Sequence, residues 1–272
     1  MKSAITVSLV SEARGGPFVF WEGLASAFSQ AAALGFDAVE IFPPSAEAID
    51  RDMLRRLCGE HGLAVAAIGT GGGWILNQWH LCHGDPTIRE QARHFIGTIV
   101  DLAAEFGAPA IVGSMQGRVE GGVARGQALE WLGDALGELG ARAAAQGEVL
   151  LYEPLNRYET NLFNRLADAA DFLDDKGIEP VRLLADLFHM NIEEASIAGA
   201  LHASARRIGH VHFADSNRRA IGFGHTEVAP VMEALRGIGY EGYLSAEIVP
   251  LPDSHTAAAQ AMKAFRQFVR HS

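Results

Sequence analysis

An eightfold alternation of short apolar runs with longer helical patterns extends through this 272-residue chain. The short runs read as continuous apolar stretches, which is typical of strands covered on both faces of a sheet. A strand followed by a helix and then by another strand predicts parallel pairing, because the helix returns the chain to the starting edge of the sheet. The alternation therefore predicts an all-parallel α/β sheet of eight strands.

The expected elements follow directly from this pattern. We expect strands at 5–10, 37–42, 63–69, 109–114, 148–153, 181–186, 208–213 and 242–247. We expect helices near 22–34, 50–61, 87–106, 125–146, 163–175, 192–205, 227–237 and 255–270. Asp85 and Pro86 read as an N-cap and a first helical residue. Six glycines fall at expected helix ends, where a left-handed cap favours glycine: Gly35, Gly62, Gly107, Gly147, Gly177 and Gly239.

Eight such units predict a (β/α)8 TIM barrel. An open doubly wound sheet is the alternative for the same strand count. The chain contains no low-complexity linker and no break in composition, so we expect a single barrel domain over residues 1–272.

Charge and composition exclude several classes of protein. A net charge of −11 argues against nucleic acid as a partner, because nucleic-acid binding relies on clustered Lys and Arg. The chain has no apolar run near the ~20 residues that cross a bilayer, and its start, MKSAITVSLV, lacks the features of a signal peptide. Cys58 and Cys82 form neither a disulfide framework nor a metal-ligand spacing. We therefore expect a cytoplasmic protein without a membrane partner.

Ionisable residues stand at the ends of the last four expected strands: Glu153, Asp186, His212 and Glu247. Strand ends of a (β/α)8 barrel meet at one mouth, where catalytic groups are found. Such groups converge in a buried site only with a compensating positive charge. Three carboxylates and one imidazole suit Mn²⁺, with Mg²⁺ or Co²⁺ also compatible, better than zinc, which favours thiolates and several imidazoles. The alternative is that Asp186 and Glu247 form ion pairs with arginines at the rim.

Three more polar residues follow these strand ends. Glu159, His189 and Arg218 lie six, three and six residues after Glu153, Asp186 and His212, respectively. We expect them on the loops that leave the strands, above the metal. His189 and Arg218 would donate to a substrate oxygen, and Glu159 would accept from a sugar hydroxyl.

The two glycine-rich stretches are weaker signals. GTGGGW (69–74) lacks the helix that a phosphate-binding loop requires directly behind it, so we expect a flexible loop at the mouth with Trp74 as a lid or wall. In SNRRAIGFGH (216–225), Arg219 faces either solvent or an anionic group of the substrate. His80 and His83 are interpreted as ordinary loop histidines.

The second half of the chain carries a family resemblance. The stretches EPLNRYETN (153–161), ADLFHMNIEE (185–194), HFADSNRR (212–219), GFGH (222–225) and SAEI (245–248) occur in the order of motifs in the xylose-isomerase-like sugar isomerases and epimerases. Within that family they resemble the metal-dependent ketose 3-epimerases of the D-tagatose, D-psicose and L-ribulose type and related keto-sugar-acid epimerases. The first half agrees only in architecture.

The resemblance implies that Glu153, Asp186, His212 and Glu247 bind one divalent ion and that Glu153 and Glu247 are the catalytic acid and base. It implies that Glu159, His189 and Arg218 contact the substrate. The activity would be inversion of the carbon next to the ketone (C3) of a ketose or keto-sugar acid through an enediolate. Ile221 and ADS (214–216) depart from the family pattern beside the substrate, so the sugar itself stays open.

Other functions remain as alternatives. An aldose–ketose isomerase uses the same barrel and ion but moves hydrogen between C1 and C2. An endonuclease-like relative would need several metals and a basic groove, which the negative charge opposes. A sugar-binding module would not require a metal. The expected partner is a small-molecule sugar, and the expected assembly is a homo-oligomer, a dimer or a tetramer.

Overall fold

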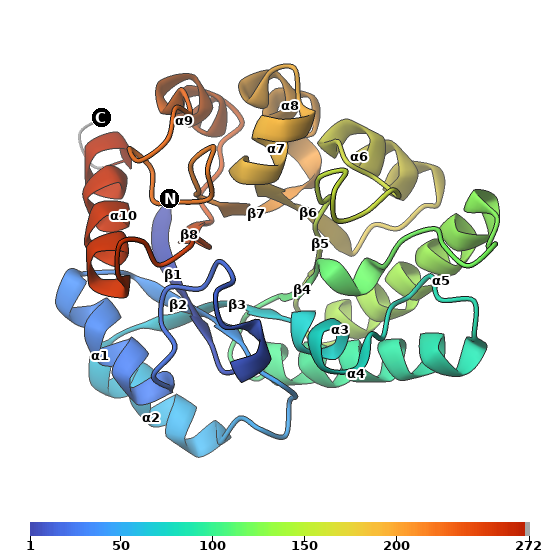
Figure 1. The fold of residues 1–272 in the computed structure, drawn as a ribbon, viewed down its shortest axis with the longest axis horizontal. Helices are drawn as coiled ribbons and strands as arrows, with labels where there is room; N and C mark the ends of the chain where they lie inside the picture. Colours follow the sequence, from blue (N-terminus) through green and yellow to red (C-terminus); the bar gives the residue numbers. More distant parts are fainter. Residues whose placement is uncertain (270–272) are drawn as a thin grey trace.

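The structure is a computed structural model that describes residues 1–269, and its eight strands close into a parallel barrel (Figure 1). The strands are β1 (Lys2–Ser8), β2 (Ala38–Phe42), β3 (Ala64–Gly69), β4 (Ala110–Val112), β5 (Leu150–Tyr152), β6 (Val181–Asp186), β7 (Ile208–His212) and β8 (Tyr243–Ala246). The ring is closed by β1 and β8, in which Lys2 lies opposite Tyr243. The expected (β/α)8 barrel is confirmed, and the open doubly wound sheet is excluded.

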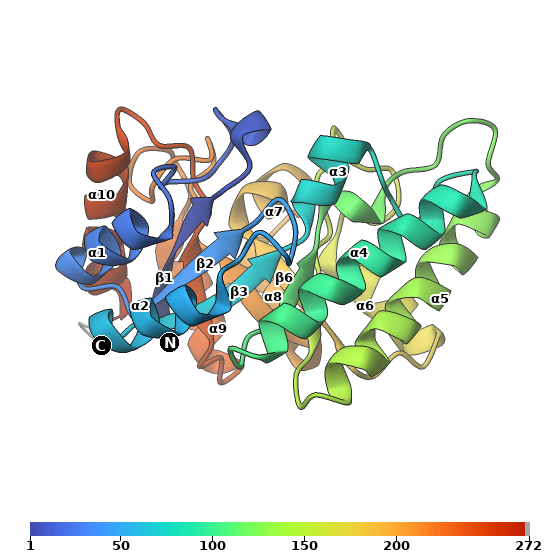
Figure 2. The ribbon, with the colours of Figure 1, turned by 90° about the horizontal axis from the view of Figure 1, so that it is seen from below.

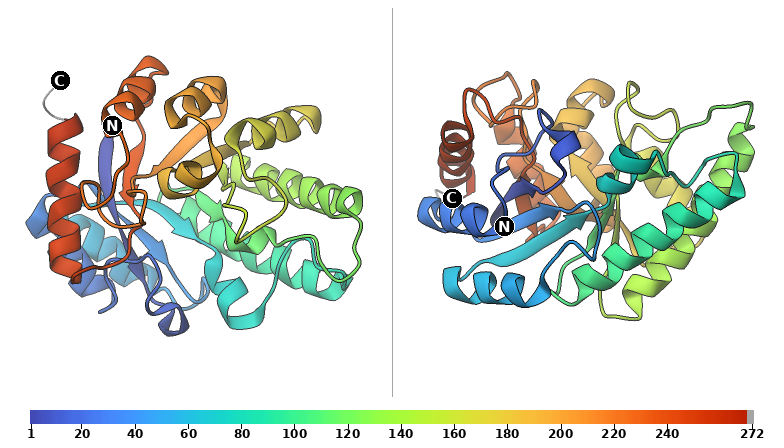
Figure 3. Two further views of the ribbon diagram at one scale, coloured as in Figure 1. Left: turned by 45° about the horizontal axis from the view of Figure 1, so that its top comes forward. Right: turned by 60° about the horizontal axis from the view of Figure 1, so that its bottom comes forward.

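Helices form the outer layer of the barrel and bury their apolar sides against the strands. They are α1 (Leu24–Leu34), α2 (Arg51–His61), α3 (Gly71–Asn77), α4 (Pro86–Ala104), α5 (Arg125–Ala144), α6 (Leu166–Asp175), α7 (Leu187–Glu193), α8 (Ile197–Ala203), α9 (Val228–Gly237) and α10 (Ser254–Val269). Three short 3-10 helices are η1 (Ser11–Ala13), η2 (Ser114–Gln116) and η3 (Ala205–Arg207). The last helix packs beside the first, which completes the outer ring (Figure 3).

The helix ends follow the predicted caps. The Asp85 carboxylate accepts a hydrogen bond from the Thr87 amide at 2.8 Å, and Pro86 begins α4. All six predicted glycines have φ between 62° and 86°, the left-handed region that side-chain-bearing residues avoid. The expected helix over 255–270 corresponds to α10, and its residue 270 lies outside the described residues. In the described part of the chain, no helix has the length and apolarity that crossing a membrane requires.

The expected helix over 192–205 is wrong in its boundaries. The Asp186 carboxylate accepts a hydrogen bond from the Phe188 amide at 2.7 Å, so α7 begins directly after β6. The chain breaks at 194–196, and Ser196 caps α8 through the Gly199 amide. His189 is therefore held in a helix instead of the expected loop, because the last residue of the strand is also an N-cap.

The expected flexible loop at GTGGGW is also wrong. These residues begin helix α3, which stands at the same end of the barrel as η1 (Figure 2). A Cβ on Gly72 would lie 2.6 Å from the Pro43 carbonyl oxygen, and a Cβ on Gly73 would lie 2.7 Å from Met115. The glycines therefore allow the helix to pack closely against its neighbours. The glycine-rich sequence indicated flexibility and gave no sign of this close packing.

The inside of the barrel is a packed layer of small and aliphatic side chains. Ala67, Ile111, Leu151 and Leu184 come from β3 to β6 and form a buried cluster that includes no helix residue. Since side chains of a strand alternate between its two faces, residues two positions further along also face inward. This rule places the side chains two positions after Ala67, Ile111, Leu151 and Leu184 at the barrel mouth.

The pairing register between β6 and β7 shifts by one residue, which changes the residues that face inward on β7. Leu183 lies opposite Ile208, but Leu184 lies opposite His210, so Gly209 is an extra residue in the pairing. A Cβ on Gly209 would lie 2.6 Å from the Arg182 Cβ and 2.9 Å from Leu151. Only glycine fits this position without displacing the neighbouring strands.

We expect Gly209→Ala to lower the free energy of unfolding by about 1–3 kcal/mol, because the added methyl group overpacks the barrel interior. Gly137→Ala is the matched control: Gly137 lies in α5, and a Cβ added there would have no other side chain or strand within 4 Å. The free energy of unfolding of that variant should rise by about 0.5–1 kcal/mol, because alanine has a higher helix propensity than glycine. Urea denaturation of both variants measures the effect, and equal stabilities would contradict the proposed close packing.

Candidate metal centre

The acidic strand ends lie directly above the packed interior of the barrel. Glu153 and Asp186 follow Leu151 and Leu184 by two residues, so both carboxylates point inward at the mouth. His212 pairs with Ser245 between β7 and β8, and Glu247 comes two residues after Ser245. The alternation of each strand thus carries its polar side chain to the same space.

The four side chains converge on a common point. His212 Nδ1 lies 3.4 Å from Glu153 Oε1, 3.4 Å from Asp186 Oδ2 and 3.5 Å from Glu247 Oε2. The four ligand atoms lie within 4.8 Å of one another, and each residue is at most 5% exposed. The structure therefore brings together all four residues that the sequence analysis selected as metal ligands.

Three of these atoms are left without hydrogen bonds. Among the described residues, Glu153 Oε1, Asp186 Oδ2 and His212 Nδ1 are buried and have no hydrogen-bond partner. Buried polar atoms are nearly always paired, because an unpaired one costs about 1–3 kcal/mol. Unpaired oxygens and an imidazole nitrogen aimed at one point fit a hard divalent cation.

The charges of the cluster also call for a cation. Burial raises the pKa of Glu247 to about 7, and the neighbouring carboxylates of Glu153 and Asp186 add to this effect. Burial opposes a proton on His212, but Glu247 and Glu40 raise its pKa well above the ordinary value. The carboxylates therefore attract positive charge to the cluster, and a divalent ion supplies it while leaving Nδ1 free to coordinate.

A second polar layer lies beneath His212, and the sequence analysis missed it. Glu40 on β2 is fully buried, and its two oxygens lie 3.0 Å from His212 Nε2 and 2.7 Å from His210 Nε2. Burial opposes ionisation of Glu40, but the two histidines hold its pKa well below the ordinary value. A carboxylate on one imidazole nitrogen orients the other toward a metal. The acidic residue within the apolar run DAVEIF was the available signal.

His189 lies above the cluster with a defined tautomer. Its Nδ1 accepts a hydrogen bond from the backbone N–H of Asn156 at 3.3 Å, so the ring proton resides on Nε2. Nε2 lies 3.6 Å from Asp186 Oδ2 and 3.9 Å from Glu153 Oε1, with no hydrogen-bond partner in the described chain. The N–H group is therefore available to a substrate oxygen. Asn156 is another residue that sequence reasoning missed.

Arg218 lies closer to the acidic cluster than the sequence analysis expected. Its Nη2 lies 2.6 Å from Glu247 Oε2 and 3.7 Å from Asp186 Oδ2, and its Nη1 lies 3.6 Å from Glu159 Oε1. Burial disfavours its charge, but Glu247 and Asp186 raise the pKa of the guanidinium above the ordinary value. Arg218 therefore compensates part of the negative charge and also lines the cavity above the cluster.

The loop that carries Arg218 is closed by Asp215. The Asp215 carboxylate accepts hydrogen bonds from four backbone amides, those of Ser216, Gly222, Gly224 and Thr226. Arg218 has a φ of 57° inside this loop. Arg219 stacks over the Phe223 ring at 4.9 Å and does not line the cavity above the cluster. Asp215 therefore fixes the position of Arg218. Sequence reasoning did not identify Asp215 as part of the site.

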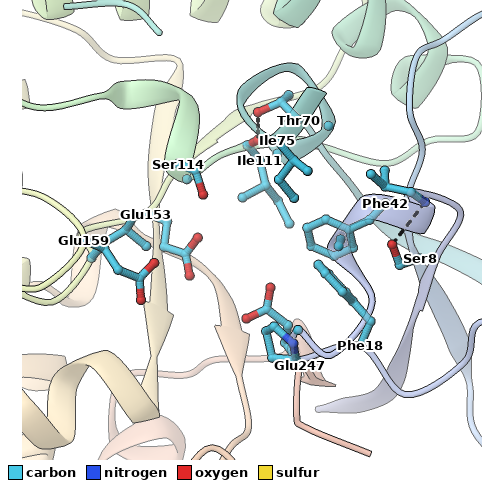
Figure 4. Close-up of a pocket in the computed structure, with 18 of the residues that line it drawn as sticks. Ser8, Phe18, Phe42, Thr70, Ile75, Ile111, Ser114, Glu153, Glu159 and Glu247 are labelled. Atoms are coloured by element: carbon cyan, nitrogen blue, oxygen red, sulfur yellow. Dashed lines mark hydrogen bonds between the residues drawn. The ribbon is translucent and has the colours of Figure 1, made fainter. Parts of the chain in front are cut away.

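A cavity of about 170 Å³ opens above the cluster, and we call it the inner cavity. Glu153 and Glu159 line one side of it, Phe18 and Phe42 line the other, and Glu247 lies between them (Figure 4). Glu159 forms part of this wall with a side chain that is 38% exposed. The inner cavity thus joins an ionic end to an apolar end.

The fold and this cluster define a (β/α)8 barrel protein with a candidate site for a divalent cation at its mouth. Residues 28–268 match the family model described as "Xylose isomerase-like TIM barrel". The chain therefore belongs to the xylose isomerase-like TIM barrel family, as the motifs of its second half indicated.

Several similar proteins are epimerases and one is a putative hydroxypyruvate isomerase, and both kinds belong to the isomerase class. The L-ribulose 3-epimerase of Mesorhizobium japonicum is 30% identical over 222 residues, which cover 78% of this chain and 71% of the relative. The 3-dehydro-D-guloside 4-epimerase of Escherichia coli K12 is 40% identical over 111 residues, and this match spans only 41% of the chain and 42% of the relative. The crystal structure of an E. coli 3-keto-D-glucoside 4-epimerase has the same fold, with a TM-score of 0.81 at 24% identity over 98% of this chain and 100% of that one.

We expect Mn²⁺ to stabilise the metal-free protein, because an ion that binds only the folded state adds its binding free energy. The gain is about 2.7 kcal/mol at a concentration one hundred times Kd. Asp186→Asn should remove most of this gain while retaining the cap of α7, since Asn also caps helices. The stabilisation is the difference between the free energies of unfolding measured with Mn²⁺ and with chelator. Asp134→Asn is the control, because Asp134 is exposed. Equal stabilisation of the Asp186 variant would exclude the cluster as the binding site.

We expect Glu40→Gln to weaken Mn²⁺ binding about 10–100-fold, because it removes the charge that orients and polarises His212. The barrel should remain folded, since the amide has the shape of the carboxylate. Competition with a fluorescent chelator measures the dissociation constant. Glu60→Gln in α2 is the control, because Glu60 is exposed. An unchanged Kd for the Glu40 variant would mean that His212 is oriented without it.

Proposed function

We propose that the chain is a metal-dependent sugar epimerase that inverts the carbon next to the ketone (C3) of a ketose or keto-sugar acid through an enediolate. Glu153, Asp186, His212 and Glu247 would hold one divalent ion, and we propose Mn²⁺, with Mg²⁺ or Co²⁺ as compatible ions. Bound there, the ion would supply Lewis acidity that polarises the ketone. The named relatives support this reaction class, because both names describe inversion of a sugar carbon.

The observation that carries the proposal is the pair Glu153 and Glu247. Their carboxylates face the inner cavity from β5 and β8, and each is 5% exposed (Figure 4). Inversion at a carbon requires a base on one face and an acid on the other. Two carboxylates entering one cavity from different strands meet this requirement, whereas a binding module has no need for them.

The proton steps balance without a co-reactant. One glutamate removes the proton from the carbon beside the ketone, and the other delivers a proton to the opposite face. The product has the same composition as the substrate, and exchange of protons with water resets the pair. The roles of Glu153 and Glu247 reverse when the other epimer is the substrate.

The residues above the cluster stabilise the negative charge that develops on the ketone oxygen. His189 presents its Nε2–H group toward the cluster, and Arg218 adds a fixed positive charge. Donors that are already in place stabilise developing charge without reorganisation. Glu159 accepts from the Asn156 side chain at 3.2 Å, and its side chain is 38% exposed, which leaves it accessible to a sugar hydroxyl.

We expect Mn²⁺-loaded protein to convert a ketose into its C3 epimer in D₂O with deuterium at C3, which NMR detects. Free ketoses, ketose phosphates and keto-sugar acids should be screened together. Deuterium at C1 would instead identify an aldose–ketose isomerase. Sugar binding that persists in chelator, without turnover, would identify a binding module.

Glu153→Gln and Glu247→Gln should each lower turnover to less than a tenth of wild type, because each variant lacks one of the two proton-transfer groups. Circular dichroism checks that the barrel remains folded, and metal analysis separates loss of the ion from loss of proton transfer. Glu241→Gln, at an exposed position before β8, is the control. More than a tenth of the activity in either variant would refute the role of that residue.

A further inference from the structure

A second cavity adjoins the inner cavity at the barrel mouth. It measures about 250 Å³, and we call it the outer cavity. Ser114, Leu155 and Glu159 line both cavities, so the two spaces meet at these side chains. Figure 4 shows Glu159 on the far side of Glu153 from Phe18. A ligand at the metal cluster can therefore extend in this direction, away from the apolar wall.

Arg118 lines the outer cavity and has no partner within the described chain. The residue is partly buried, yet its guanidinium forms no hydrogen bond, ion pair or ring contact with another described residue. A guanidinium carries five N–H donors, and the protein leaves those of Arg118 free. Every other described arginine that is buried or partly buried has a carboxylate, a carbonyl oxygen or an aromatic ring beside its guanidinium: Arg51, Arg89, Arg93, Arg182, Arg207, Arg218 and Arg219.

The backbone on both sides of Arg118 is fixed. The Gly117 carbonyl oxygen accepts a hydrogen bond from the Thr160 hydroxyl at 2.8 Å. The Val119 amide donates to Asn161 Oδ1 at 2.7 Å, and the Val119 carbonyl oxygen accepts from Asn161 Nδ2 at 3.0 Å. Arg118 therefore extends from a segment that is tied to the loop after β5. A segment that is in place before a ligand arrives lowers the entropic cost of binding.

The opposite wall of the outer cavity is also packed in place. Trp74 lines the cavity and packs edge-to-face against His80 with 5.6 Å between ring centroids. His80 is 1% exposed, in contrast to the ordinary loop histidine expected from the sequence. Any Cβ on Gly117 would overlap with the His80 ring, so glycine at this position leaves room for the ring. Trp74 therefore forms a wall of the outer cavity.

The negative charge at the junction of the two cavities is compensated from the inner side. Glu159 is the acidic residue among those that line the outer cavity, and no ion pair joins it to Arg118 in the described chain. Glu159 Oε1 lies 3.6 Å from Arg218 Nη1 and accepts a hydrogen bond from Asn156 Nδ2 at 3.2 Å. The positive charge of Arg118 is therefore left uncompensated in the outer cavity.

An uncompensated guanidinium is suited to an oxyanion, because its planar set of N–H groups matches the oxygens of a carboxylate or a phosphate. We propose that Arg118 binds an anionic group of the substrate, and that the substrate is a ketose with a terminal carboxylate or phosphate. The ketone and C3 lie at the metal cluster, and the anionic end lies in the outer cavity. Arg219, which the sequence made a candidate for such a group, stacks on Phe223 and lines neither cavity.

This inference rests on the proposed epimerase function and narrows its substrate class. The chemical step is unchanged: one proton leaves C3 and another is added on the opposite face. The anionic group forms and breaks no bond, and no oxidant or reductant is consumed. Its contact with Arg118 contributes binding energy only.

Ketoses that differ at one terminal carbon isolate the contribution of Arg118. D-fructose, D-fructuronate and D-fructose 6-phosphate differ only at C6, and D-fructose 1-phosphate carries the anion at the other end. The corresponding D-tagatose series repeats the comparison on a second parent sugar. On Mn²⁺-loaded protein, we expect kcat/KM for at least one anionic ketose to exceed that for its neutral parent about tenfold or more. Loss of the NMR signal of the C3 proton in D₂O measures each rate.

Arg118→Leu should lower the ratio of anionic to neutral kcat/KM about tenfold or more, because it removes the charge and the donors. Arg118→Lys should retain part of the ratio, since lysine keeps the charge without the planar set of donors. Arg56→Leu is the matched control, because Arg56 lies on α2, is exposed and lines neither cavity. The control removes the same charge and should retain the wild-type ratio.

Calorimetry on Mn²⁺-loaded protein gives a readout that does not depend on turnover. We expect at least one anionic ketose of each series to bind the wild-type protein more tightly than its neutral parent, and Arg118→Leu should abolish the difference. Failure of every ketose to exchange its C3 proton refutes the epimerase, and this comparison then decides the inference by itself. Binding that depends on Arg118 supports the anion site, and equal binding of neutral and anionic ketoses overturns it.

The rates separate the remaining outcomes. Turnover of a neutral ketose with kcat/KM equal to or above that of its anionic relatives overturns the inference and leaves the epimerase intact. A preference for the anion that persists in Arg118→Leu also overturns it. A gain with the carboxylate alone identifies a keto-sugar acid, and a gain with a phosphate identifies a ketose phosphate. Either gain supports the inference when Arg118→Leu abolishes it.

Discussion

Mutual repulsion among buried carboxylates is the constraint around which the barrel mouth is organised. Glu153, Asp186 and Glu247 bring three acidic groups within a few ångströms of one another, largely out of contact with water. Isolated buried charges of this kind are very costly unless they are paired or bound to a metal. The cluster is stable only with positive charge at its centre, from protons or from a cation. The unpaired atoms of the cluster favour the cation.

The surrounding polar residues distribute this charge through the structure. Glu40 binds the far nitrogen of His212 from below, and Arg218 contacts Glu247 from above. Asp215 in turn holds the loop of Arg218 through four backbone amides. His212 and Arg218 are thus each oriented by another group behind them, which is what a preorganised site requires.

The two halves of the chain contribute different parts of the site. The second half supplies the cluster, His189 and Arg218, and it carries the motifs of the family. The first half supplies Glu40 beneath the cluster and much of the wall around the substrate space, including Phe18, Phe42 and Trp74. The cluster residues themselves thus all come from the second half, whereas the surrounding wall comes from both halves. This explains why motifs that predict the reaction leave the sugar open.

The strand pattern was enough to predict the barrel and the convergence of four side chains, and the family motifs were enough to predict an isomerase. Strand periodicity and strand-end position are local properties, and they place Glu153 or Asp186 at the mouth whatever lies around them. The expected dimer or tetramer stays a prediction. Two features became evident only from the three-dimensional arrangement: His189 stands on a helix, and Glu40 orients His212. The contact of Glu40 with His212 joins residues far apart in the chain, and the strand pattern that brought the four strand ends together gives no sign of it. The helix of His189 follows instead from a local cap, because the Asp186 carboxylate accepts from the Phe188 amide.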